Sequence, residues 1–375
     1  MSTTNQLKIG VIGCGGIAQM MHLPFLFSMR DAFAIRALSD ISPGVLQAMG
    51  ERYQVPQSAC FTNFAGLLQQ DLDAVLVLSG GDHTPQALAA LESGKHVFVE
   101  KPLCFTLQEA DELARAARQA NRQLMVGYMK RYDPGYQYAL ARLPEMGPIR
   151  YAQINTLHPA EDDYLRIHNI LRFDDVPPET LKAIREADHL KVVEAIGEVS
   201  ANLQALYPNV FLGSMVHDTN ALRGLLGEPE GVLFSELWPQ ESQPVSITTL
   251  LGYPGDLRVV YTWTYLAELR DYFQEIALMS AGHRLRIQFP SPYLRHFPTP
   301  VVFQGMEGEA SYEKRVTASY DEAFRRELEA FYDNIINDRR PLTDVEDARR
   351  DIQLLQQILA ALHPHGLGGE AAQLL

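Results

Sequence analysis

A glycine-rich loop near the N-terminus carries residue types that could bind a phosphorylated cofactor. Gly13, Gly15 and Ala18 form a G-x-G-x-x-A motif directly after a short apolar run. Gly13 permits a tight turn, Gly15 lets the backbone approach a pyrophosphate, and a small residue at position 18 keeps helix and strand close. Free N–H groups at the start of the next helix, among them those of Gly16 and Ile17, would hold the phosphates with the help of the helix dipole.

An acidic residue follows at the spacing that ribose recognition requires. Asp40 lies about 20 residues beyond the loop and directly after a second apolar run. A carboxylate there accepts hydrogen bonds from the adenosine ribose hydroxyls, and it would repel a 2′-phosphate. Because no arginine follows Asp40, the sequence predicts NAD as the cofactor and makes NADP the weaker candidate.

Lys101 is the strongest candidate for proton chemistry. It follows the apolar run 96–99, which is expected to end at the edge of the sheet where open α/β folds bind ligands. A lysine beside a positively charged nicotinamide ring should have a lowered pKa, so it could bind a substrate hydroxyl and accept its proton. The alternative is a surface lysine whose stem covers apolar neighbours.

Alternating strands and helices are expected to position these residues over the first 127 residues. The expected strands are the apolar runs 8–12, 33–38, 73–78, 96–99 and 124–126. Thr106, with Glu109 three residues later, has the pattern of a capping box at the start of a helix. This alternation predicts a parallel, doubly wound sheet.

The whole chain has the composition of a globular protein with room for two domains, since it has 375 residues and is 46% hydrophobic. No apolar run reaches the roughly 18 residues that a membrane helix needs, and residues 1–6 lack signal-peptide character. The three cysteines suggest neither a disulfide framework nor a zinc site, which fits a cytoplasmic location. The formal net charge of −14 argues against a nucleic-acid partner.

Four stretches of the sequence make the chain resemble the glucose-fructose oxidoreductase, inositol dehydrogenase and rhizopine catabolism (Gfo/Idh/MocA) family. They are the glycine loop, the stretch ALAALESGKHVFVEKP (87–102) and the stretch GYMKRYDPGY (127–136), and residues 324–354 also fit the family's closing helices. The resemblance implies a Rossmann-fold NAD-binding domain over residues 1–127. It implies an α+β domain over residues 128–375 for substrate binding and dimerisation, with an open, mostly antiparallel sheet, and hence a homodimer or homotetramer.

The resemblance also extends the list of cofactor and substrate contacts. Ser79, His83 and Glu100 would contact the cofactor, and a cis bond before Pro102 would aim Lys101 into the cleft. Tyr128 and Arg131 would bind the substrate, although an interdomain ion pair is an equal alternative for Arg131.

His217 is the second catalytic candidate that the resemblance implies. Family members usually have an aspartate four positions before this histidine and another three positions after it, whereas this chain has Gly213 and Asn220 there. Asp218 is adjacent but should face elsewhere, because neighbouring residues on a helix do not share a face.

One long polar segment, residues 157–199, departs from the family pattern. Its possible apolar positions are Leu181, Ile184, Val192, Val193 and Ile196. It could be a surface insertion or a lid over the substrate. The glycine-rich end, residues 366–375, is expected to be a mobile tail, and His363 and His365 are not expected to bind a metal.

These features favour an NAD-dependent oxidoreductase that moves a hydride between nicotinamide and a hydroxyl or keto carbon of a sugar, inositol or related polyol. No metal is expected. One alternative is an enzyme that uses NAD only transiently, for epimerisation or elimination. The other is a non-catalytic cofactor-binding sensor.

Overall fold

The computed structural model describes residues 6–160, 162–239 and 245–362, so the predicted tail and the His363 and His365 pair lie outside the described residues. The chain forms two compact units. The first unit combines Met1–Met129, His168–Val216 and Phe324–Gln353, and the second combines Lys130–Ile167, His217–Ala323 and Leu354–Leu375. The predicted domain boundary between residues 127 and 128 stays a prediction. The grouping shows that two later segments pack with the N-terminal unit.

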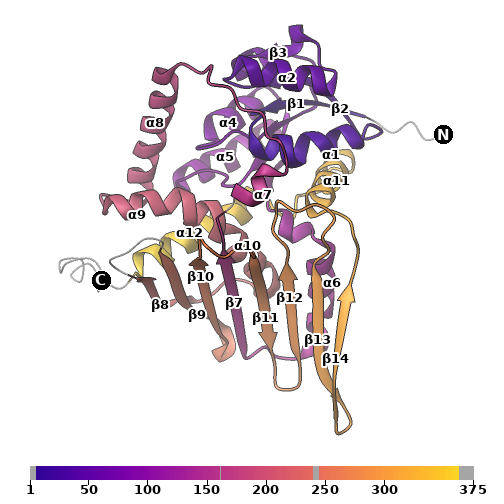
Figure 1. The fold of residues 1–375 in the computed structure, drawn as a ribbon, viewed down its shortest axis with the longest axis vertical. Coiled ribbons are helices and arrows are strands. Elements are labelled where there is room, and N and C mark those ends of the chain that lie inside the picture. Colours follow the sequence, from indigo (N-terminus) through magenta and orange to yellow (C-terminus); the bar gives the residue numbers. More distant parts are fainter. Residues whose placement is uncertain (1–5, 161, 240–244, 363–375) are drawn as a thin grey trace. The chain divides into compact units, whose positions relative to one another are not determined.

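The first unit is built on a six-stranded parallel sheet (Figure 1). Its strands, in the spatial order β3-β2-β1-β4-β5-β6, are β1 (Leu7–Ile12), β2 (Phe33–Ser39), β3 (Cys60–Phe61), β4 (Ala74–Val77), β5 (His96–Glu100) and β6 (Leu124–Gly127). All residues of β4 and β6 are buried, as expected for strands covered on both faces. The predicted doubly wound parallel sheet is therefore confirmed, and its strand order is that of dinucleotide-binding folds.

Helices connect these strands. They are η1 (Ala18–His22), α1 (Leu23–Ser28), α2 (Pro43–Tyr53), η2 (Gln57–Ala59), α3 (Phe64–Leu68), α4 (Thr84–Glu92) and α5 (Leu107–Ala120). The predicted capping box begins α5, where the Thr106 hydroxyl accepts from the Glu109 amide and the Glu109 carboxylate accepts from the Thr106 amide. Later segments add α8 (Pro178–Ile196), α9 (Ala201–Leu206), η4 (Tyr207–Met215), α11 (Ala323–Ile336) and most of α12 (Val345–Ala360).

The second unit is built on an eight-stranded sheet whose order is β14-β13-β12-β11-β7-β10-β9-β8. The strands are β7 (Tyr151–His158), β8 (Gly231–Trp238), β9 (Ser246–Gly252), β10 (Arg258–Tyr265), β11 (Phe273–Met279), β12 (Arg284–Phe289), β13 (Pro300–Glu307) and β14 (Ala310–Thr317). Among these pairs only β7 and β10 are parallel. The predicted mostly antiparallel α+β part is confirmed.

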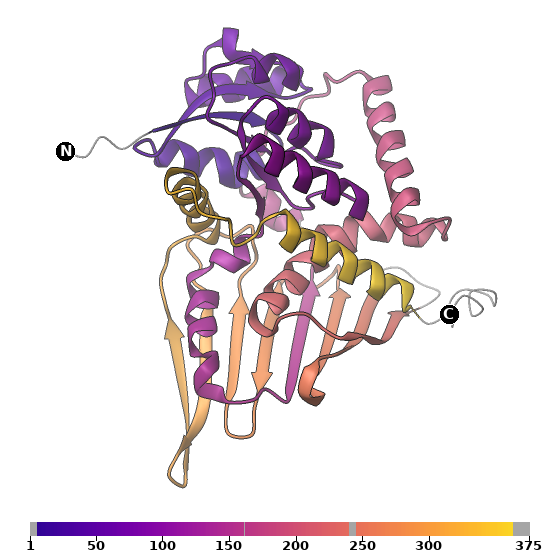
Figure 2. The same cartoon turned by 180° about the vertical axis from the view of Figure 1, so that it is seen from behind.

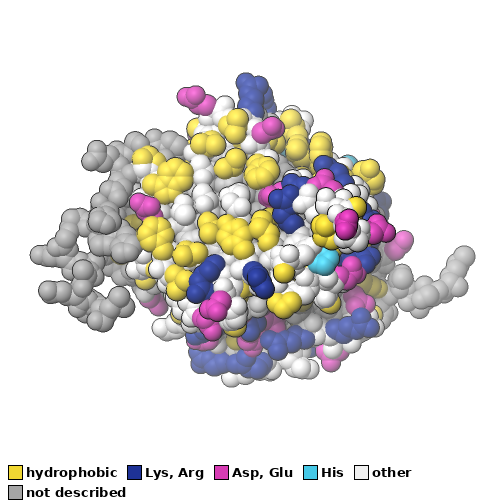
Figure 3. Space-filling view, turned by 90° about the horizontal axis from the view of Figure 1, so that it is seen from below, with side chains coloured by type: hydrophobic (Ala, Val, Ile, Leu, Met, Phe, Trp, Pro, Cys, Tyr) yellow, Lys and Arg dark blue, Asp and Glu magenta, His cyan; other side chains and the backbone are white. Residues whose placement is uncertain are grey.

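Three α-helices and two 3-10 turns of the second unit are η3 (Met129–Tyr132), α6 (Pro134–Met146), α7 (Asp162–Arg166), α10 (Val216–Leu226) and η5 (Pro254–Asp256). Helices α6 and α10 lie over one face of the sheet (Figure 2). Side chains remain exposed on several strands, including Leu233, Phe273, Met306 and Tyr312. The view from below shows hydrophobic side chains gathered between charged ones (Figure 3).

Among the described residues, every helix is too short or too polar to cross a membrane.

Candidate cofactor and active site

A pocket of about 610 Å³ opens at the carboxyl edge of the first unit's sheet. It is lined by the glycine loop, by the ends of β2 and β4 and by part of α8. Among the predicted cofactor contacts, Gly13, Gly15, Gly16, Ile17, Asp40 and Ser79 line this pocket. Residues that are far apart in sequence thus meet at the place where open α/β folds bind ligands.

The two motif glycines meet different constraints. Gly13 has a positive φ of 88°, and a Cβ there would lie 2.4 Å from the backbone nitrogen of Ser79, so no other residue fits without a shift. A Cβ on Gly15 would meet nothing within 4 Å. Gly15 therefore leaves open space beside its backbone, which is what the approach of a pyrophosphate requires.

Asp40 closes one end of this pocket. One carboxylate oxygen accepts from the Cys14 amide at 2.7 Å, and the other accepts from the Ser42 amide at 2.9 Å. These bonds fix a half-buried carboxylate beside the glycine loop. An ionised carboxylate has about four acceptor sites, so Asp40 retains capacity for ribose hydroxyls.

Of the two predicted contacts on the loop after β4, Ser79 lines the pocket and His83 is buried beside it. The buried hydroxyl of Ser79 has no hydrogen-bond partner in the structure. His83 is buried, with Nδ1 2.6 Å from the Pro102 carbonyl oxygen and Nε2 2.5 Å from the Ser79 carbonyl oxygen. His83 thus ties the Ser79 loop to the Lys101–Pro102 turn, while direct contact between its ring and a cofactor stays a prediction.

Lys101 lies at the end of β5, and its peptide bond to Pro102 is cis, as the resemblance implied. Its ammonium donates to the Gly213 carbonyl oxygen at 2.5 Å. Gly213 is the position where relatives were expected to have an aspartate. Lys101 therefore contacts a neutral backbone oxygen of η4, at the position where the resemblance implied a carboxylate side chain.

Glu100 faces away from open solvent into a buried cluster. It is 4% exposed, contacts His22 Nε2 at 2.7 Å and accepts from the Lys101 amide at 2.9 Å. Burial acts to raise the pKa of Glu100, but the hydrogen bond and charge of His22, with the nearby Lys101, lower it overall. Its predicted contact with the cofactor stays a prediction, since its described partners belong to the protein.

Glu327 of α11 completes this cluster, which the sequence did not predict. It is fully buried, and neither carboxylate oxygen has a hydrogen-bond partner. Burial, and then the charge of Glu100, raise its pKa well above the usual range. One ligand atom each of His22, Glu100 and Glu327 lies within 4.8 Å of the others, a spacing that a metal ion could also accept. The absence of a metal therefore stays a prediction.

The second unit contains His217, near the start of α10, where it is half-buried. The adjacent Asp218 is buried and points into a polar network. It accepts from Thr156 at 2.8 Å and Tyr261 at 2.7 Å, and it also contacts Lys130 and Gln274. Burial, and then Asp218, raise the pKa of Tyr261 well above its usual value. That His217 faces away from Asp218 stays a prediction.

Arg131 and Tyr128, the predicted substrate contacts, are both buried. Arg131 donates to the backbone oxygen of Asn220 at 3.3 Å, within the second unit. A Cβ at Gly224 would lie 2.4 Å from Arg131 Nε, so this glycine makes room for the guanidinium. Substrate binding by Arg131 and Tyr128 stays a prediction.

The polar segment 157–199 is divided between the units, and its part from His168 onward belongs to the first. Its predicted apolar face is not continuously buried: only Val192 of α8 is buried, whereas Leu181 and Ile184 are each 38% exposed. Both of these side chains line the pocket of the glycine loop, as does Asp188. The segment therefore forms one wall of that pocket.

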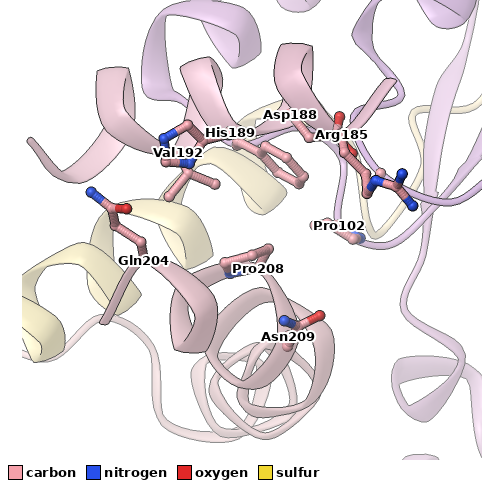
Figure 4. A pocket seen from close by; sticks show the side chains of 10 residues that line it. Pro102, Arg185, Asp188, His189, Val192, Gln204, Pro208 and Asn209 are labelled. Carbon is pink, nitrogen blue, oxygen red and sulfur yellow. The ribbon is translucent and has the colours of Figure 1, made fainter. Parts of the chain in front are cut away.

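A second pocket of about 350 Å³ lies further along α8. Arg185, Asp188, His189 and Val192 of α8 face residues of α9 and η4 across it (Figure 4). Pro102 and Gly81 also line it. Asp188 lines both pockets, so the two pockets adjoin at this residue of α8.

The parallel sheet and the glycine-loop pocket define a dinucleotide-binding domain. Residues 7–128 match the model of the Gfo/Idh/MocA oxidoreductase family, described as having an NAD-binding Rossmann fold. This part of the chain, under half of its length, therefore resembles that oxidoreductase family, as the sequence motifs predicted.

Curated relatives agree with this resemblance. Inositol 2-dehydrogenase from Paracoccus denitrificans is 38% identical over 133 residues, which are 35% of this chain and 39% of that protein. The match to that relative thus spans well under half of its length. Inositol 2-dehydrogenase from Burkholderia cenocepacia is 28% identical over 334 residues, covering 88% of this chain and 86% of that protein.

Solved structures show the same fold across both units. A 3-ketoreductase from Actinomadura kijaniata, in complex with NADP and TDP-benzene, has a TM-score of 0.71 at 20% identity and covers 96% of this chain and 98% of its own. An aldose-aldose oxidoreductase from Caulobacter crescentus has a TM-score of 0.69 at 19% identity, with 95% and 97% covered. These likenesses confirm the predicted fold class.

Proposed function

We propose that the protein is an NAD-dependent oxidoreductase that moves a hydride between nicotinamide and a hydroxyl or keto carbon of a sugar, inositol or related polyol. The observation that carries this proposal is the joint placement of the glycine loop, Asp40 and the partnerless Ser79 hydroxyl around one pocket. The names of the relatives support the substrate class.

The residues of the chain have distinct roles in this proposal. NAD, when bound, accepts the hydride. Lys101, in its neutral amine form, binds the substrate hydroxyl and accepts its proton, and in doing so it exchanges its bond to the Gly213 carbonyl for one to the substrate. His217 orients the substrate. Asp218 holds α10, which carries His217, against the sheet.

Turnover with a panel of sugars and polyols tests this function. We expect NADH to accumulate with at least one polyol in proportion to the polyol consumed. Full conversion of a substrate with no net NADH would instead favour transient use of the cofactor. Tight NAD binding with no turnover across the panel would favour a sensor.

Homo-oligomer formation is part of the same proposal. Leu233, Phe273 and Met306 are exposed apolar side chains on strands of the second unit, and contact with a second copy of the chain would bury side chains of this kind. Sedimentation equilibrium should therefore give a mass of two or four chains.

A further inference from the structure

The segment before α8 follows the rim of the cofactor pocket. Residues 169–175, called the strap below, can be traced in Figure 1 to the start of α8. The Leu171 amide donates to Gln19 Oε1 at 2.9 Å, and Gln19 Nε2 donates to the Leu171 carbonyl at 3.1 Å. Ile170 lies 3.8 Å from the Cβ position of Gly16, in the glycine loop. The strap is thus fastened to the phosphate end of the pocket by a paired amide contact.

The far end of the strap is fastened to the start of α2. One oxygen of Asp175 accepts from the Ser42 hydroxyl at 2.6 Å, and the other accepts from the Gly44 amide at 2.6 Å. Phe173 covers the same turn, since its ring carbon lies 2.6 Å from the Cβ position of Gly44. The two hydrogen bonds lower the pKa of Asp175, so its carboxylate is ionised at neutral pH.

This contact fills an anion-binding position. The N-terminus of a helix such as α2 attracts negative charge through its free N–H groups and its dipole. Ser42 joins two carboxylates there, because its amide donates to Asp40 and its hydroxyl donates to Asp175. A 2′-phosphate on a ribose held by Asp40 would face this same turn. Arg172, the cation of the strap, is exposed and takes no part in these bonds.

We propose that Asp175 is a second determinant of NAD over NADP, brought to the adenosine end of the pocket by the strap. This inference rests on the proposed NAD-dependent function. Asp40 repels a 2′-phosphate from the strand side, and Asp175 occupies the helix N-terminus that would otherwise receive it. The specificity therefore depends in part on a segment that lies far from the glycine motif in the sequence.

The experiment measures NAD and NADP affinities by titration calorimetry for the wild type and four variants: Asp175→Asn, Asp175→Ser, Asp174→Asn and Asp40→Ser. Asp174 is an exposed neighbour, so its variant removes the same formal charge without touching the contact of Asp175 with Ser42 and Gly44. We expect Asp175→Asn to tighten NADP binding by about 10-fold, as removal of a nearby like charge should. NAD affinity should change little, and the gain should shrink at about 1 M salt, where screening is strong.

The outcomes separate this inference from the function on which it rests. A gain in NADP affinity that Asp175→Asn shows and Asp174→Asn does not supports the inference. Equal effects of Asp175→Asn and Asp174→Asn on NADP affinity would overturn the inference. If Asp40→Ser still narrowed the difference between NAD and NADP affinity, the proposed NAD preference would stay intact. A wild type that binds neither dinucleotide would overturn both. Melting curves of the variants confirm that each is folded, and Asp175→Ser, which removes the charge with a smaller side chain, should repeat the gain.

Discussion

Two polar regions of this molecule are built in opposite ways. The glycine-loop pocket keeps hydrogen-bonding groups and space available for a ligand. The Ser79 hydroxyl has no hydrogen-bond partner among the described residues, and Gly15 faces open space. In the second unit, Asp218 is surrounded by donors from Thr156, Tyr261, Lys130 and Gln274. Polar groups without hydrogen-bond partners indicate a site that receives a ligand, whereas a carboxylate whose hydrogen bonds are all made within the protein indicates a structural role.

The largest effect is expected at Lys101. Lys101→Met keeps the apolar stem but removes the proton-accepting amine, so kcat should fall by about 10²–10⁴-fold. NAD affinity should change little. Lys95→Met provides the matched control, since Lys95 precedes β5 at its other end and should leave turnover unchanged. Turnover of Lys101→Met near the wild-type level would remove this lysine from the chemistry.

Asp218 should matter for stability. Asp218→Asn cannot satisfy all of the donors around it, and it leaves Lys130 without its buried counter-charge. We expect the free energy of unfolding to fall by about 3 kcal/mol, as for other broken buried ion pairs. Urea denaturation measures this loss. Glu309→Gln, at an exposed acid of the same unit, is the control; a similar loss in both variants would contradict the structural role of Asp218.

His217 should have an intermediate effect on turnover. If it orients the substrate, His217→Asn should lower kcat/KM by about 10- to 10²-fold, less than Lys101→Met. Steady-state kinetics of both variants on one polyol give the order. Loss of all turnover in His217→Asn alone would reverse the assigned roles.

Glu327 gives the smallest and most specific effect. Because its pKa is raised in the folded protein, the folded state keeps a proton that the unfolded state releases above its ordinary pKa of 4.5. The stability due to this proton is therefore present at low pH and is lost as the pH rises. Glu327→Gln cannot ionise, so its Tm should exceed that of the wild type by about 2 °C or more at pH 8, and by less at pH 5. A difference independent of pH would contradict a protonated Glu327.

The sequence predicted the features that local patterns determine. The glycine loop, the strand before it and the capping box of Thr106 and Glu109 depend on neighbouring residues, so their spacing is visible in the chain. The two-residue strand β3 leaves too short a pattern to be found.

The tertiary partners could not be predicted in the same way. His22, Glu100 and Glu327 meet only because α11 packs with the N-terminal unit. A signal did exist: Glu327 occupies a helical position between Phe324 and Phe331 on the apolar face. Asp175 offered no comparable signal, since it is one of several acids in a polar segment whose partner is the start of α2.

Calorimetric titration of the wild-type protein with NAD and with NADP tests the central claim most directly, because that claim concerns what the glycine-loop pocket holds. The arrangement of Asp40 predicts one site per chain, with NAD bound at least about 10-fold more tightly than NADP. Equal affinities for the two cofactors, or tighter binding of NADP, would contradict the account.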